Sequence, residues 1–423
     1  MNHRTQRVLR PTLALIVVLG LANVAQAEQA ESGPSLKSAD PMVQAVLASN
    51  PGLQAMQAAV DEARARADAA GRLDDPTLAY LSAPETIGSR IGTRHIVQFS
   101  QPIPWPGTLS DRRARGDALQ TAQDFKRRDL ELHLMHTTRA LFAEWQFVHA
   151  ALDVNQAQQS LLAELVEAAR GRYAGGRGTQ QEVLQAQLEL ERLRQTHLQW
   201  QQQRETLQAQ LNALLNRPSD SPLPPPIRAF DSGRPGPTGS GDHPAVASIE
   251  AELQAREYEL ELAQRKHYPD FRLMANYVGT LDPEEKRLQL GAAINLPIGF
   301  GRLRAEKDAA RAALERARHE LEDRRAKLAR DRTIALTAFQ RADERVVLLE
   351  TRVLPLSVDN FQAALGDYRS GRGSFLNVID AHQRRLQAEL DLARGRADRA
   401  RAIADWRHWA NAHRPVHGHG EHK

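Results

Sequence analysis

The residues best suited to bind a metal ion lie near the C-terminus of the chain. His417, His419 and His422 follow one another at intervals of two and three residues. Imidazole suits borderline cations such as zinc and copper, so these three side chains could share one ion. The same segment contains Gly418 and Gly420 and has no core-forming pattern. A disordered tail whose histidines bind nothing therefore remains the alternative interpretation.

Other chemistry is scarce along the chain. Cysteine is absent, which excludes disulfides, thiolate metal sites, a cysteine nucleophile and a lipid-modified N-terminal cysteine. There is no P-loop, no zinc-protease motif, no nucleophile elbow and no dinucleotide fingerprint. The glycine-rich run 175–178 precedes no strand–helix unit, so we interpret it as a turn between antiparallel helices. We therefore expect neither an enzyme nor a cofactor.

The composition is typical of long helices. Of the 423 residues, 26% are charged and only 5% are aromatic, and Ala, Leu, Arg, Gln and Glu dominate. The formal net charge is +4, but Arg4, Arg7 and Arg10 lie in a segment that we expect to be removed. Without them 53 basic and 52 acidic residues remain. The charge therefore gives no reason to expect nucleic-acid binding.

The N-terminus has the features of an export signal. Residues 1–10 carry three arginines and no acid, and 12–22 form an apolar core too short to span a bilayer comfortably. Ala25 and Ala27 give the small-x-small pattern of a cleavage site, which predicts a signal peptide over 1–27. An uncleaved anchor is the alternative. No later stretch approaches the ~18 apolar residues of a spanning helix.

The rest of the chain is an internal repeat. Three pairs of segments match at offsets of 193, 194 and 195 residues, as expected for one duplicated unit with small loop changes. The pairs are 50–52 with 243–245, 100–107 with 294–301, and 172–179 with 367–374. The predicted organisation is a linker over 28–40, a first repeat over 41–216, a Pro/Gly/Ser-rich linker over 217–242, a second repeat over 243–412 and the His-rich tail over 413–423.

Each repeat is expected to contain a helix, two strands, a very long helix, a tight turn and another helix. The long helices are predicted over about 108–172 and 302–367, each roughly 100 Å long. Shorter helices are expected over about 41–73, 179–216, 244–267 and 374–411. Apolar residues at coiled-coil spacing support the long helices. They are Leu134, Leu141, Trp145, Val148 and Leu152 in the first helix, and Leu314, Leu321, Leu328, Phe339, Val346 and Val353 in the second.

Four strands are expected where the chain reverses. Apolar and polar residues alternate there, which predicts one apolar and one polar face. The apolar set is Leu78, Tyr80, Val97, Phe99, Phe271, Leu273, Ala275, Tyr277, Leu288, Leu290, Ala292 and Ile294. A half-buried sheet of a soluble protein is the alternative. In lipid, where open edges are not tolerated, several chains would have to close the sheet together. Tyr80, Phe99, Trp105, Tyr268 and Tyr277 would then be interfacial anchors.

This combination resembles the TolC family of outer-membrane efflux channels. The most specific motifs are Gln-Pro-Ile-Pro-Trp-Pro-Gly at 101–107 and the run from Tyr368 to Ala381. The first is similar to the branch that serves heavy-metal pumps of the resistance-nodulation-division (RND) type. The resemblance implies a mainly α fold with a small β part. It also implies a homotrimer in the outer membrane of a Gram-negative bacterium, with a shared twelve-strand β-barrel and a periplasmic α-barrel. A periplasmic adapter and an inner-membrane RND pump are the implied partners, together with outer-membrane lipid.

The two turns are the candidate periplasmic tip and gate. Thr179 and Ser374 are expected to cap the helices that follow these turns, and Pro355 is expected to kink the second long helix. The resemblance places two gate acids at Asn377 and Asp380, so only one acid is retained, and it places a basic residue at Gly373. Three Asp380 carboxylates around a pore would attract cations; a solvated helix-start residue is the alternative. The full candidate set is Tyr173, Gly176, Gly178, Tyr368, Gly371, Gly373, Asn377 and Asp380.

The sequence thus predicts a passive exit duct for heavy-metal cations, driven by a separate pump. A drug-efflux or type I secretion duct with the same fold is one alternative. A periplasmic coiled-coil adapter or structural protein is another, although adapters carry a single hairpin within a lipoyl-like β domain, and this chain has two long hairpins and no such domain.

Overall fold

The computed structural model of the protein describes residues 36–83, 94–227, 229–231, 233–236, 242–279 and 287–410. The chain divides into two compact units. Unit 1 comprises Met1–Ser49, Thr137–Ser232 and Ala342–Arg401, and unit 2 comprises Asn50–His136, Gly233–Arg341 and Ala402–Lys423. The predicted signal peptide and the His-rich tail lie outside the described residues.

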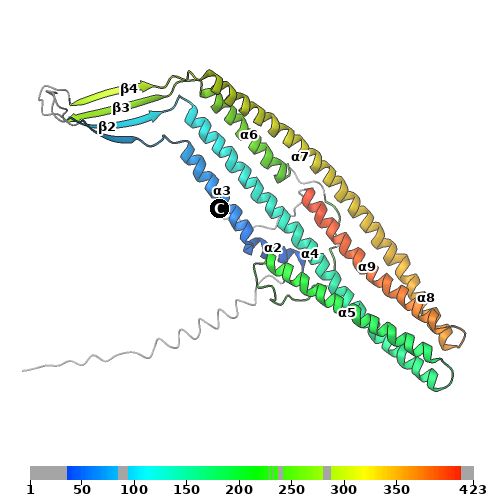
Figure 1. The fold of residues 1–423 in the computed structure, drawn as a ribbon. Coiled ribbons are helices and arrows are strands. Elements are labelled where there is room, and N and C mark those ends of the chain that lie inside the picture. Colours follow the sequence, from blue (N-terminus) through cyan, green and yellow to red (C-terminus); the bar gives the residue numbers. More distant parts are fainter. Residues whose placement is uncertain are drawn as a thin grey trace, which may run out of the picture. The chain divides into compact units, whose positions relative to one another are not determined.

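The element order repeats, as the sequence predicts (Figure 1). The helices are α2 (Ala39–Ser49), α3 (Pro51–Ala70), α4 (Thr108–Ala174), α5 (Gln180–Leu214), α6 (Pro244–Arg265), α7 (Phe300–Leu348), a π-helical turn η2 (Leu349–Val353), α8 (Leu354–Arg369) and α9 (Phe375–Trp409). The fold is therefore mainly helical, with α4 alone spanning 67 residues. The single helix predicted over 41–73 is wrong, because the chain breaks at Asn50. The Asn50 side chain accepts hydrogen bonds from the backbone N–H groups of Gly52 and Leu53 and so caps α3.

Unit 2 contains the sheet, whose four strands are antiparallel in the order β1-β2-β3-β4 (Figure 1). They are β1 (Thr77–Ala83), β2 (Arg94–Ile103), β3 (Phe271–Gly279) and β4 (Leu288–Ile294). The register pairs Tyr80 with Val97, Val97 with Tyr277, and Tyr277 with Leu288. Since paired residues point to the same side, the predicted apolar set lies on one face. This face is open in the single chain: Leu290 is 80% exposed.

The predicted stripes of the long helices are buried at most positions. Leu134, Trp145 and Val148 of α4 are buried, and Leu141 and Leu152 are partly buried. In the second repeat five of the six stripe residues are buried. Val353 is the exception, being 38% exposed. It lies in the π-helical turn, which adds a residue to the helical repeat and so rotates the following residues away from the stripe.

The two units have separate cores. In unit 1, Trp145, Phe142 and Val148 of α4 pack with residues of α2, α5 and α9, including Met42 and Leu211. A second cluster of unit 1 joins the ends of α4 and α8 to the starts of α5 and α9. In unit 2, small clusters join α7 to α6 and to the end of α9. None of the helices within the described ranges combines the length and the apolar character needed to cross a bilayer.

Candidate functional site

The two predicted turns lie in unit 1, between α4 and α5 and between α8 and α9 (Figure 1). Gly176 and Gly371 have φ values of +66° and +78°, which glycine adopts without steric cost. Backbone bonds from Arg177 N–H to Arg172 O and from Arg372 N–H to Asp367 O, both 2.9 Å, close the preceding helices. The two turns therefore share a left-handed glycine and the same closing backbone hydrogen bond.

Side-chain caps begin the next helices, as the sequence predicts. Thr179 Oγ1 accepts from the Glu182 backbone N–H, and Ser374 Oγ accepts from the Asn377 N–H, each at 3.3 Å. Gly373 has little free space, because an added Cβ would lie 3.0 Å from Asp367 Cβ. A larger residue at position 373 would therefore require the neighbouring atoms of Asp367 to shift.

The equivalent tyrosines of the two turns have different surroundings. Tyr173 is 50% exposed, whereas Tyr368 is 3% exposed. The Tyr368 hydroxyl donates to Glu182 Oε2 at 2.9 Å, and the Arg172 guanidinium lies 4.4 Å from the centre of its ring. Burial and the Glu182 contact raise the pKa of Tyr368 to about 12. Tyr368 therefore ties the second turn to both helices that flank the first.

Removing the Tyr368 hydroxyl is expected to loosen this contact. Tyr368→Phe should lower the free energy of unfolding of unit 1 by about 1–3 kcal/mol, because the Glu182 carboxylate loses the hydrogen bond that it accepts from the Tyr368 hydroxyl. Hydrogen exchange of the α8–α9 turn, measured by mass spectrometry, should become faster. Tyr173→Phe is the matched control and should leave the exchange of both turns unchanged, since its side chain is exposed. Equal exchange in the two variants would contradict the importance of the Tyr368 contact.

Asn377 and Asp380 of α9 line a groove shared with α5, about 530 Å³ in volume. Gln185, Leu188, Glu189 and Arg192 form the α5 side. Asp380 is half exposed and pairs with Arg384 of the same helix at 3.1 Å. Six of the eight predicted tip residues lie in the two turns or at the helix ends that flank them, and Asn377 and Asp380 lie in the first turns of α9.

Pro355 lies in the first turn of α8, directly after the π-helical turn. Proline lacks the N–H of the regular helix and its ring crowds the preceding carbonyls, so the wider π turn relieves the clash. Leu349, in that turn, packs with Val346 and Leu392. The second long helix is therefore irregular directly before Pro355, while α4 continues unbroken to Ala174. The kink itself stays a prediction.

Unit 2 contains a histidine cluster that no sequence motif predicts. His133 and His136 of α4 lie with their ring centres 6.3 and 5.3 Å from that of His408 of α9, and His243 lies 5.5 Å from it. His243 Nδ1 lies 3.2 Å from the Ala245 backbone N–H and its Nε2 lies 3.1 Å from His408 O. The neutral ring can accept the first bond while donating the second, which links the start of α6 to the end of α9.

Within the described ranges, no group of three or more His, Cys, Asp or Glu side chains is arranged to hold a metal ion. The three tail histidines predicted as weak ligands, His417, His419 and His422, lie outside the described residues. Their role as metal ligands therefore stays a prediction.

Comparison with known proteins gives a family match over most of the chain. The family described as "Outer membrane efflux protein" matches residues 42–217 and 241–408. The cobalt-zinc-cadmium resistance protein CzcC of Cupriavidus metallidurans is 26% identical over 147 residues. That match spans only about a third of either chain, 35% of each.

Solved structures share the fold over nearly the whole length. CusC superimposes with a TM-score of 0.79 at 17% identity, covering 88% of this chain and 91% of the other. The outer-membrane channel OprN gives 0.77 at 18% identity, covering 89% and 90%. VceC of Vibrio cholerae gives 0.77 at 18% identity, covering 88% and 95%. At these identities the likeness concerns the fold.

Proposed function

The chain belongs to the outer membrane efflux protein family, and we propose that it is the exit duct of a tripartite system that exports heavy-metal cations. The family match along both repeats is the observation that carries the channel function. The partial identity with CzcC supports a metal cargo. The duct itself performs no reaction on its cargo, and the energy comes from the inner-membrane pump.

The proposed working form is a homotrimer in the outer membrane of a Gram-negative bacterium. β1 and β4 are edge strands in the single chain, and the apolar sheet face is exposed. A trimer in the membrane explains both features: three copies pair their edge strands with one another, and the apolar face of the shared sheet contacts lipid. The helical tip then meets a periplasmic adapter and an RND pump. Co-fractionation with outer membrane as a trimer supports this assembly, and a monodisperse monomer that needs no detergent contradicts it.

Deletion of the gene tests the cargo. Cells without the protein should become sensitive to at least one of cobalt, zinc, cadmium, copper and silver, and the full chain should restore tolerance. A chain lacking 413–423 should restore most of it, because a tail is not the conduit. Unchanged tolerance to all five cations together with new drug sensitivity would favour a drug-efflux duct instead.

Asp380 is proposed to act on cations at the tip. Three carboxylates near a narrow passage raise the local cation concentration. Asp380→Asn should therefore reduce the cation-over-anion selectivity of single channels by roughly two- to tenfold, while trimers still assemble. The measurement is the reversal potential in a salt gradient.

Asp323→Asn is the matched control for this prediction. Asp323 of α7 has a similar exposure, 59% against 56%, and pairs with Lys327 four residues later, as Asp380 pairs with Arg384. The control should keep the selectivity of the original channel. The same selectivity in all three channels would show that Asp380 does not face the ion path.

A further inference from the structure

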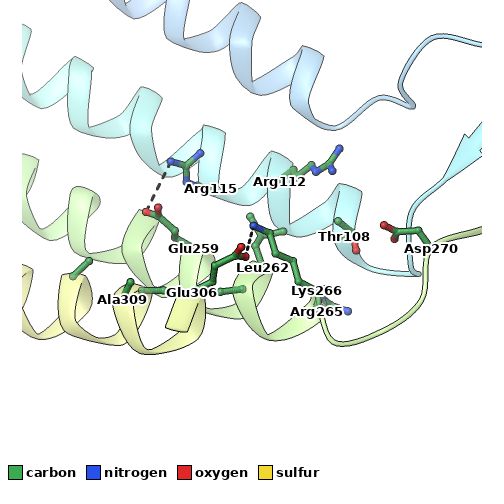
Figure 2. Close-up of a pocket in the computed structure, with 13 residues that line it drawn as sticks. Thr108, Arg112, Arg115, Glu259, Leu262, Arg265, Lys266, Asp270, Glu306 and Ala309 are labelled. Atoms are coloured by element: carbon green, nitrogen blue, oxygen red, sulfur yellow. Dashed lines mark hydrogen bonds and ion pairs between the residues drawn. The ribbon is translucent and has the colours of Figure 1, made fainter. Parts of the chain in front are cut away.

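A charged groove of about 590 Å³ lies at the root of the sheet in unit 2 (Figure 2). Its walls come from the first turns of α4, the end of α6 and the start of α7. It reaches Thr108, five residues after β2, and Asp270, which directly precedes β3. The groove therefore adjoins the level at which the apolar sheet gives way to charged helices.

The groove is lined by four basic and three acidic side chains. They are Arg112, Arg115, Arg265 and Lys266, and Glu259, Asp270 and Glu306. Two of the basic groups are engaged. Arg265 donates to the Asp111 carboxylate and, at 3.0 Å, to Pro106 O. Lys266 lies 3.0 Å from Glu306, and its hydrogen bond together with that from Arg302 lowers the pKa of Glu306.

Arg112 and Arg115 retain unused hydrogen-bond donors. Their nearest carboxylates are those of Asp74 and Glu259, at 3.8 and 3.9 Å, beyond hydrogen-bond range. Arg115 Nε is buried and has no partner among the described residues. Figure 2 shows Arg115 reaching from α4 toward Glu259 of α6. Two guanidinium groups within one turn of α4 thus line the groove with free donors.

An aromatic cluster lies beside the groove, where the Trp105 backbone N–H donates to Asp270 at 2.9 Å. Trp105 stacks on Tyr268 and Phe271, with ring centres 4.9 and 5.9 Å apart. Ile298, which follows β4, and Phe300, the first residue of α7, are exposed apolar residues. Aromatic rings between an apolar surface and cationic side chains are typical of the headgroup level of a membrane.

We infer that this groove binds the headgroup of a zwitterionic glycerophospholipid, with Arg112 and Arg115 on its phosphate. The inference rests on the proposed function, because the sheet must lie in a membrane for the lipid to reach the groove. Guanidinium groups match phosphate oxygens with paired hydrogen bonds. The near balance of four positive and three negative groups suits a phosphate that carries its own amine better than an anionic lipid.

Ala309, Ala310 and Ala313 of α7 line the end of the groove that lies away from the sheet (Figure 2). The acyl chains of a bound lipid therefore leave the groove at the other end, past Thr108 and Asp270, toward the exposed apolar residues of the sheet.

Binding can be measured on the full chain purified in detergent and freed of lipid. Native mass spectrometry is used with short-chain phosphatidylethanolamine, short-chain phosphatidylglycerol and inorganic phosphate as separate probes. Phosphatidylethanolamine should bind tightest, and Arg112→Gln/Arg115→Gln should weaken it by about tenfold or more. Arg316→Gln/Arg318→Gln, whose arginines pair with glutamates of their own helix, should bind as the original chain does.

Three outcomes overturn the inference. In the first, the Arg112/Arg115 variant binds the lipid as the original chain does, and in the second, phosphatidylglycerol binds as tightly as phosphatidylethanolamine. The third outcome is that inorganic phosphate binds as tightly as the lipid and with the same dependence on the two arginines, which identifies a free-phosphate site. If the double variant does not fold by circular dichroism, Arg112→Lys/Arg115→Lys keeps the charge and should still weaken binding several-fold. Conductance and metal tolerance are measured separately, so a chain that binds this lipid without conducting metal contradicts only the proposed function.

Discussion

Trp145→Ala is expected to lower the free energy of unfolding of unit 1 by about 3–5 kcal/mol. Trp145 is 1% exposed and belongs to the largest apolar side chains of the unit 1 core. Its ring contacts the His149 imidazole edge-on, with ring centres 4.5 Å apart. Truncation removes this apolar area from the core and leaves a cavity between α4 and the helices packed on it, which the long helices cannot close without shifting. The shift in the urea unfolding transition, followed by circular dichroism, measures the effect.

Trp200→Ala is the matched control for that experiment. Trp200 of α5 is only partly buried and contacts Phe147 at the margin of the same core, with ring centres 5.4 Å apart. Because less apolar area returns to water, its loss should be clearly smaller. Equal losses for the two tryptophans would contradict a core centred on Trp145.

The repeat and the periodic stripes were predictable because they depend on local spacing. Leu314, Leu321 and Leu328 are buried where a seven-residue period places them. The prediction fails at Val353, where Pro355 forces a π turn and changes the phase of the helix. A proline in the sequence predicts that the helix is irregular there. The backbone conformation that relieves the clash of the proline ring depends on the packing around Leu349.

The strands were also predictable, since alternation alone assigns residues to faces. Tyr277 and Leu288 share a face because β3 and β4 pair in the register that joins them. The surroundings of the two turns were predictable only in part. Tyr173 and Tyr368 occupy equivalent places in one repeated motif, yet only Tyr368 is buried. The difference arises from Arg172 and Glu182, which belong to the other turn, and a single motif carries no signal for such a contact.

The histidine cluster had no sequence signal at all. Its members come from three segments far apart in the chain: His133, His136 and His408 lie within helices, and His243 directly precedes one. His243 was expected only as the residue before a helix start. In the structure its imidazole caps α6 through Nδ1 and bonds to His408 O through Nε2. The second bond depends on how α6 and α9 pack together within unit 2.

Acidification is expected to destabilise unit 2 through this cluster. Burial, followed by the neighbouring histidines, lowers the pKa of His408 from 6.5 to about 3. Burial also lowers the pKa of His243, despite Asp129 nearby. A lowered folded pKa means that the unfolded chain binds the proton first as pH falls. The stabilisation is therefore complete above about pH 6.5 and is lost progressively toward pH 3.

Between pH 7.5 and 4.5 the contribution of His408 to the free energy of unfolding should fall by about 2–3 kcal/mol. The loss begins near pH 6.5, and each pH unit below that value costs about 1.4 kcal/mol. Protonation of His243 should add to the loss, because a protonated Nδ1 can no longer accept the Ala245 N–H bond at the start of α6. The measurement is the urea midpoint as a function of pH. Carboxylates elsewhere also titrate in this range, so the comparison must be made between variants.

His408→Phe keeps a ring in the cluster and removes its titration. It is expected to flatten the pH dependence between 6.5 and 4.5 relative to the original chain, whatever its effect at pH 7.5. His319→Phe is the control: this imidazole of α7 is largely exposed beside Glu322, and its removal should leave the slope unchanged. Because His133, His136 and His243 lower the pKa of His408 in the same cluster, His243→Asn should also reduce the slope while retaining a side chain that caps α6. An identical slope in the original chain and in His408→Phe would show that His408 is not the group whose protonation limits the stability of unit 2 in acid.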